Sequence, residues 1–337
     1  PFLRQHLTGL VTSFYEAPES EIFLRVNGQV IWRGSKVGQL EKSQKILTPK
    51  IKPIKSDELD KSSLEKIQRK LDIFIENKVK TLMPNLLTLA NNNKLRGAAA
   101  GFAHIFVNNL GVIMKSEVIE QFNSIDNESK VKLRSFGIRF GYKTIYDATL
   151  LKPEASRLRI ALFNVFCATS ETALFHPQPG LVTVEYDKHI SKKQYLVAGF
   201  FVAGNRAIRI DMLERLFFMI KEYSKDEWIV IQPAMLSITG LGLEKFTELI
   251  RSLRFEIKHE KIEKGSEVIT FEKDDEHYKV LFKKQVINKR VKLMPDSETF
   301  KKTKQNRKKN REKKQMPTIK NIAIISNANL GIDCIIP

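Results

Sequence analysis

Two short dipeptides and one long helical period constrain the fold of this chain more than its composition does. Asn27-Gly28 separates the apolar runs EIFLRV and QVIW, and Gly204-Asn205 lies between FFVA and RAIRI. Glycine and asparagine tolerate the positive φ of tight turns, so both sites predict antiparallel hairpins, the first with a type I′ turn. From Ser62 onward, apolar residues instead recur every three or four positions, which is the period of a helix. The chain is therefore predicted to be α+β and mainly helical.

Changes in composition and period divide the chain into five parts. They predict a small β unit over residues 1–55, a helical accessory domain over 56–175, an α+β module resembling a helix-turn-helix over 176–265, a linker able to form short strands over 266–300, and a disordered basic tail over 301–337. Within the β unit, a third strand over residues 34–40 should follow the hairpin. Pro49 and Pro53 should then end regular pairing, because proline lacks the amide hydrogen of a strand ladder.

The helical part carries start and stop signals of its own. Ser62 and Glu65 have the spacing of a capping box, and Pro84 should end or kink the first helix. Residues 95–112 are rich in glycine and alanine, which predicts close packing between helices. Pro153 is suited to the first position of a further helix. The core-facing stripe of the first helix consists of Leu64, Ile67, Leu71, Phe74, Ile75, Val79 and Leu82.

The segment MLSITGLGLEKFTELIRSLRF predicts a helix-turn-helix. Gly240 and Gly242 supply the turn between two short helices. Such an outline often serves only as a scaffold, so by itself it is weak evidence for DNA binding. The core-facing stripe of the second helix consists of Phe246, Leu249, Ile250 and Leu253.

Cations and aromatic rings alternate in LRSFGIRFGYKTIYDATLLKPEASRLRIALF, residues 133–163. Such interleaving can bind phosphates and stack bases, and it can equally be ordinary packing with aromatic rings beneath surface arginines. On the first interpretation, the phosphate-contacting residues are Arg134, Arg139, Lys143 and Arg159. Phe140 and Tyr142 would stack on a base or brace the site.

The chain is strongly basic, with 57 Lys and Arg against 38 Asp and Glu and a net charge of +19. Such an excess favours polyanionic partners such as RNA or DNA. Part of it is concentrated in residues 301–314, where nine basic residues accompany one acid; this run is a candidate electrostatic arm, the alternative being a merely solvated tail. The basic residues of this arm are Lys301, Lys302, Lys304, Arg307, Lys308, Lys309, Arg311, Lys313 and Lys314.

Several function classes have no support in the sequence. The chain carries no GxxxxGK[ST], GxSxG or HExxH motif and no paired CxxC, so no catalytic residue, cofactor site or metal site is predicted. An enzyme with a cryptic site around Tyr146, Asp147 and His176 is the weakest alternative. Two isolated cysteines and the lack of a long apolar run or signal peptide predict a cytoplasmic protein with no membrane partner.

The run LRSFGIRFGYKTIYDATLLKP resembles the C-terminal half of bacterial DEAD/DEAH-type ATP-dependent helicases related to the mitochondrial degradosome RNA helicase. An Arg-x-x-Gly-x-Arg-Phe-Gly stretch there leads into Ile-Tyr and then Leu-Leu-Lys-Pro. The first hairpin, LRGAAAGFAHIFVNNLGV, YLVAGFFVAGNRAIRIDMLERL and the helix-turn-helix segment follow the family's order, so the resemblance covers roughly residues 20–260. The basic tail also resembles that of the family.

The resemblance implies an accessory role rather than a motor. Members of that family carry two RecA-like domains with the ATP site ahead of this region, and neither is present here, so we expect the chain to begin inside a longer protein. ATP and Mg²⁺ would belong to those motor domains. The implied partners are RNA or DNA, the motor domains in cis and an RNA-degradation protein. The alternative is a module that docks a helicase or nuclease without touching nucleic acid.

Overall fold

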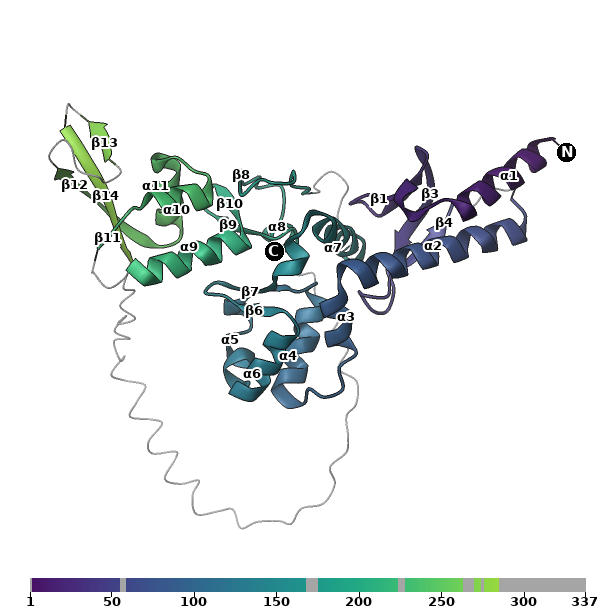
Figure 1. Cartoon of the computed structure of the whole chain (residues 1–337), viewed down its shortest axis with the longest axis horizontal. Helices are drawn as coiled ribbons and strands as arrows, with labels where there is room; N and C mark the ends of the chain where they lie inside the picture. Colours follow the sequence, from purple (N-terminus) through teal and green to yellow (C-terminus); the bar gives the residue numbers. More distant parts are fainter. Residues whose placement is uncertain are drawn as a thin grey trace, which may run out of the picture. The chain divides into compact units, whose positions relative to one another are not determined.

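The computed structural model describes residues 2–54, 59–167, 175–223, 228–262, 270–273 and 276–284. Contacts group Pro1–Lys284 into one unit. Its described part combines α-helices with four small antiparallel sheets (Figure 1), so the predicted α+β class is confirmed. The predicted tail over residues 301–337 lies outside the described residues. No helix within the described ranges has the length and hydropathy needed to cross a membrane.

The first sheet joins four strands in sequence order: β1 (Ile22–Leu24), β2 (Gln29–Trp32), β3 (Ser35–Glu41) and β4 (Lys50–Pro53). The predicted hairpin is confirmed, but its turn is not type I′. The Gly28 amide donates to the Arg25 carbonyl at 2.9 Å, and Gly28 has a φ of +81° while Asn27 does not enter the positive-φ region. Only one residue of the turn is left-handed, which matches a three-residue loop closed by a glycine bulge.

Two features of this first part differ from the prediction. A helix, α1 (Phe2–Glu16), precedes the sheet. It packs against α2 (Lys61–Leu82), the helix that follows the sheet. Pro49 does not interrupt pairing, because residues 50–53 form β4 alongside β3, whereas the strand does end at Pro53 as predicted. Pro49 lies just before this strand and Pro53 is its last residue. β4 is an edge strand, where a missing amide hydrogen is tolerated.

The long helix α2 (Lys61–Leu82) confirms the predicted period. Leu71, Phe74, Ile75 and Val79 are buried on its core face. Its cap is Asp60 rather than Ser62, since the Asp60 carboxylate accepts the Ser63 amide at 3.3 Å. The helix ends at Leu82, and Pro84 takes the first position of α3 (Pro84–Ala90), as predicted. Figure 1 shows α2 alongside α1 and β4.

The alanine-rich stretch forms α4 (Gly97–Asn108), which packs against three short helices. These are α3, α5 (Ile119–Ser124) and α6 (Asn127–Ser135). Ala99 and Ala103 are buried, which confirms close packing on this side. The opposite side is open, since a Cβ built on Gly101 would have no neighbour within 4 Å.

The second sheet has the order β5-β7-β6 and holds the distinctive run. Its strands are β5 (Val112–Met114), β6 (Ile138–Phe140) and β7 (Thr144–Asp147). The short helix η3 (Ala148–Leu151) leads from β7 to α7 (Pro153–Phe166), which begins at Pro153 as predicted. α7 packs against α2 and α8 (Lys192–Val197) and is buried along most of its length.

The third sheet contains the second predicted hairpin. Its order is β8 (Thr183–Glu185), β10 (Arg206–Arg209) and β9 (Phe200–Ala203). Ala203 pairs with Arg206, so a two-residue turn joins the strands, and Gly204 takes a φ of +60° in it. The hairpin is confirmed, and it leads directly into α9 (Ile210–Tyr223).

The last part is a helix-turn-helix with an added β-hairpin. α10 (Pro233–Thr239) is followed by its C-cap, Gly240, which adopts the left-handed conformation. α11 (Leu243–Ser252) comes next. Three strands follow or precede these helices: β11 (Ile229–Val230), β12 (Phe255–Ile262) and β14 (Glu276–Lys284). They pair in the order β11-β14-β12, which with the two helices is the arrangement of a winged helix-turn-helix (Figure 1). β13 (Thr270–Lys273) pairs with β14 as well. Short strands were predicted within residues 266–300, and β14 is the central strand of this sheet.

Candidate nucleic-acid interface

The predicted cation and aromatic residues lie where α6, β6 and β7 meet. Arg134 is in the last turn of α6, Arg139 and Phe140 are on β6, and Tyr142 and Lys143 form the loop to β7. The antiparallel pairing of Phe140 with Ile145 folds this loop back on itself. Four of the six residues predicted in the run thus lie on one short hairpin, and Arg134 joins them from the end of α6.

Phe140 is the centre of an aromatic cluster rather than a free ring. It packs edge-on against Phe102 of α4, with ring centroids 6.4 Å apart, and against Phe122 of α5 at 5.1 Å. The side chain is half-buried among partly buried hydrophobic residues of the main core. Phe140 therefore braces the surface, which was one of its two predicted roles.

Three cations lie over this aromatic cluster. The Arg134 guanidinium is 5.1 Å from the centroid of Phe140, and the Lys115 and Lys130 ammonium groups are 5.2 and 4.8 Å from that of Phe122. Such contacts orient a cation without neutralising its charge. Lys115 also donates to the Gly141 carbonyl at 3.2 Å. Lys115 and Lys130 were not predicted, because neither lies within the alternating run.

Tyr142 forms a second aromatic pair with a residue of α9. Its ring stacks on Phe217, with centroids 4.6 Å apart and ring planes 19° apart. Tyr142 is 49% exposed although one face of its ring is covered. The Lys143 ammonium lies 5.9 Å from the Tyr142 centroid, and the Lys284 ammonium lies 5.5 Å from it. An exposed ring flanked by two ammonium groups can contact a base and its phosphates.

The loop between β6 and β7 is held by a carboxylate from α9. Glu214 accepts hydrogen bonds from the Lys143 amide at 3.0 Å and from the Thr144 amide and hydroxyl at 2.8 Å each. Its second oxygen accepts the Tyr142 amide. Three successive amides pointing at one anion form a concave anion-binding nest. The role of Glu214 could not be predicted from residues 133–163, because Glu214 lies 70 positions from Thr144 in the sequence.

Arg139 is exposed on β6 and lies opposite Tyr146 in the strand register. Tyr146 itself is 5% exposed. Burial raises the pKa of Tyr146, while the positive charge of Arg139 acts in the opposite direction. The exposed Arg139 guanidinium is thus already engaged by the Tyr146 side chain, and Tyr146 is neutral at physiological pH.

The prediction that Arg159 contacts a phosphate is wrong, because its side chain is fully buried in α7 and does not reach the surface. Its guanidinium donates to the Leu110 carbonyl at 2.8 Å and to the Leu150 carbonyl at 3.1 Å. Burial lowers the pKa of Arg159 to about 9, although Asp147 acts against the shift. Arg159 thus ties α7 to the end of α4 and to η3. The nine predicted tail residues, Lys301 to Lys314, lie outside the described part of the chain.

The helix-turn-helix does not present a basic face on α11. The charged residues of this helix are Glu244, Lys245, Glu248 and Arg251, all exposed, so the charges balance. A helix that enters the major groove of DNA contacts a dense row of phosphates, which two glutamates oppose. The charge of α11 favours the predicted scaffold role.

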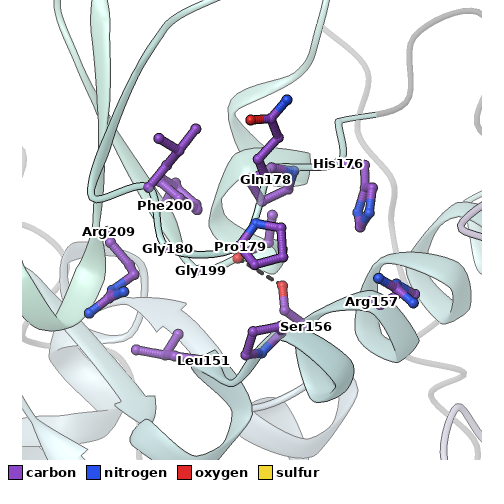
Figure 2. A pocket seen from close by; sticks show the side chains of 14 residues that line it. Leu151, Ser156, Arg157, His176, Gln178, Pro179, Gly180, Gly199, Phe200 and Arg209 are labelled. Atoms are coloured by element: carbon purple, nitrogen blue, oxygen red, sulfur yellow. Dashed lines mark hydrogen bonds between the residues drawn. The ribbon is translucent and has the colours of Figure 1, made fainter.

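A cavity of about 70 Å³ lies between α7 and β9, and Figure 2 shows its lining. Ser156 donates its hydroxyl to the Ala198 carbonyl at 3.0 Å, so that proton is not directed at His176. Burial, and then the charge of Arg157, lower the pKa of His176. Asp147 is buried and accepts from Asn85 and Thr149. Tyr146, Asp147 and His176 thus carry no nucleophile and base in contact, and the described residues contain no cluster of metal-ligating side chains.

Comparison with protein-family models, with curated proteins and with solved structures finds no match to this chain.

Proposed function

We propose that this chain is the accessory nucleic-acid-binding portion of an ATP-dependent helicase, with RNA or DNA as its ligand, and that it has no ATPase motor of its own. The single observation that carries the binding proposal is the surface around the β6–β7 hairpin. There the pairs Phe122–Phe140 and Tyr142–Phe217 are each flanked by cations. The helicase assignment rests on the sequence resemblance, which covers roughly residues 20–260 and is most specific at residues 133–153.

The mechanism is passive. Arg134, Arg139 and Lys143 contact backbone phosphates and release their counterions, which makes binding salt-dependent and tolerant of sequence. Lys115 and Lys130 lie on the same surface and add to its positive potential. The basic tail over residues 301–314 raises local affinity through its charge.

The test replaces Arg134, Arg139 and Lys143 together by glutamine and measures RNA binding over a series of salt concentrations. The variant should bind more weakly, and its plot of log affinity against log salt should be flatter by about 2, since each lost contact to a single strand contributes about 0.7. A matched control replaces Lys36, Lys66 and Arg69, which are exposed on β3 and α2, by glutamine. Equal weakening by both triples, or unchanged affinity in a folded test variant, would contradict the proposed interface.

A second experiment tests the helicase assignment. The coding sequence upstream of the codon for Pro1 should contain an in-frame GxxxxGK[ST] motif and an acidic box. An open upstream frame without them contradicts the assignment and leaves nucleic-acid binding as the proposed activity.

The balanced charge of α11 favours a second candidate, a module that docks a motor or nuclease. Deleting residues 301–337 from the variant in which Arg134, Arg139 and Lys143 are replaced separates the two candidates, because both proposed basic surfaces are then removed. A large loss of RNA binding supports the nucleic-acid role, whereas little loss together with retained binding to a helicase or nuclease partner supports docking.

A further inference from the structure

We propose that Tyr142 is a stacking platform for an unpaired base and that Glu214 is the positioning residue that holds it. This proposal rests on the proposed function, because it names the form of nucleic acid that the β6–β7 surface takes. It adds a specificity that phosphate contacts cannot supply. A chain that reads only phosphates binds single and double strands alike, whereas a stacking ring needs a base whose face is free.

The structure distinguishes Tyr142 from Phe140 as a stacking ring. Phe140 contacts two phenylalanine rings and packs among residues of the main core, so the fold itself already fills its surroundings. Tyr142 rests one face on Phe217 and keeps 49% of its surface exposed. A ring supported from below is already ordered, so a base that stacks on it loses little additional side-chain freedom.

Glu214 and Phe217 act from the same face of α9. They are three positions apart, so their side chains point in the same direction. Glu214 receives the amides of Tyr142, Lys143 and Thr144, and Phe217 supports the Tyr142 ring. The backbone and the ring of the platform are thereby both set by α9.

The ligand is a single-stranded nucleic acid. In a duplex the faces of the bases are covered by their neighbours, so Tyr142 has nothing to stack on except a terminal pair. The Lys143 and Lys284 ammonium groups lie over the Tyr142 ring, 5.9 and 5.5 Å from its centroid. Both are ends of flexible side chains, so an unpaired base that stacks on the ring displaces them toward its own flanking phosphates.

The first experiment compares three probes: a single-stranded oligothymidylate, the corresponding duplex, and an abasic deoxyribose phosphate strand of the same length. Tyr142→Ala should weaken binding to the oligothymidylate roughly 5- to 150-fold, the effect of losing one stacked base, and leave binding to the abasic strand and the duplex unchanged. Tyr142→Phe should restore binding. The control is Tyr15→Ala on α1, a tyrosine that is 45% exposed.

The second experiment tests Glu214 through a spectroscopic signal. Tyr142→Trp should show fluorescence quenching by the oligothymidylate but not by the abasic strand, and Glu214→Ala in that background should abolish most of it. Glu214→Gln should retain part of the quenching, because its amide oxygen at the Oε1 position still accepts three of the four hydrogen bonds, whereas its NH2 group cannot accept the Tyr142 amide. Glu222→Ala, elsewhere on α9, is the control.

The outcomes separate this inference from the proposed function. If the unmodified chain binds neither RNA nor any of the three probes, the proposed function fails and this inference fails with it. Binding to RNA but to none of the three probes overturns only this inference. If the chain binds and the Arg134, Arg139 and Lys143 triple weakens binding, but folded Tyr142→Ala binds the oligothymidylate like the unmodified chain, only the platform is overturned. Equal loss on the abasic strand would also overturn it, because the ring would then act through the fold.

Discussion

The Glu214 carboxylate occupies the space where Gly141 would carry a side chain. A Cβ built on Gly141 would lie 2.6 Å from both carboxylate oxygens, which is closer than real Cβ contacts. The φ of Gly141 is not positive, so its backbone could accommodate any residue if Glu214 were absent. Glycine is needed at this position because α9 approaches the loop closely.

This contact predicts a coupled pair of substitutions. Gly141→Ala should lower the free energy of unfolding by about 1–3 kcal/mol, since the new methyl group overpacks the nest. In a Glu214→Ala background the same change should cost less by at least about 0.5 kcal/mol, because the clash is gone. Urea unfolding of the four chains measures the coupling. Additive effects would show that the loop does not depend on this approach.

Gly240 provides a contrast in which the backbone alone matters. Its φ is +65°, and a Cβ built there would meet nothing within 4 Å. Gly240→Ala should therefore cost about 1 kcal/mol of stability, and Gly240→Asn should cost less, since asparagine tolerates the left-handed region. Thermal melts of both variants provide the measurement. A larger loss in the asparagine variant than in the alanine variant would contradict this explanation.

Arg159 should prove important for folding rather than for nucleic-acid binding. Arg159→Met keeps most of the volume but leaves the buried Leu110 and Leu150 carbonyls without their donor, which should cost roughly 2–4 kcal/mol. Arg157→Met, an exposed change on the same helix, should stay within about 0.5 kcal/mol of the unmodified chain. Chemical denaturation measures both, and equal stability of the two variants would contradict the buried role.

The cap of α6 predicts a dependence of stability on acid. The Asp126 carboxylate accepts the Ser129 amide at 2.7 Å, and this bond lowers its pKa below 3.8. Because the folded pKa is the lower one, the stabilisation is complete above pH 3.8 and is lost as the pH falls through the folded pKa. Asp126→Asn keeps the hydrogen bond without the charge, so its melting temperature should fall less on acidification. Parallel pH profiles would contradict this assignment.

Features that depend on neighbours in the chain could be predicted from the sequence. The hairpins at Gly28 and Gly204, the buried stripe of α2 and the start of α7 at Pro153 all follow from local φ preferences and a repeating period. Where local signals were weak or overruled, prediction failed. The helix α1 was missed, and β4 forms next to Pro49 because an edge strand needs fewer amide donors.

Some residues of the candidate interface could likewise be predicted from the sequence, and others could not. Its cations and rings within residues 134–143 could be predicted because they alternate along one short stretch of sequence. Arg159 followed the same pattern, but two carbonyls at the ends of other elements draw it into the interior. Glu214 and Phe217 were invisible, since they reach the loop only when α9 packs against it.

By itself, the sequence determined the element types, the main hairpins and the concentration of positive charge. Tertiary structure alone decided which cations remain at the surface, which ring stays open and which carboxylate orders the loop. The physical reason is range: φ preference and hydrophobic period act between neighbouring residues, whereas burial and hydrogen-bond partners depend on segments that meet only in the folded chain.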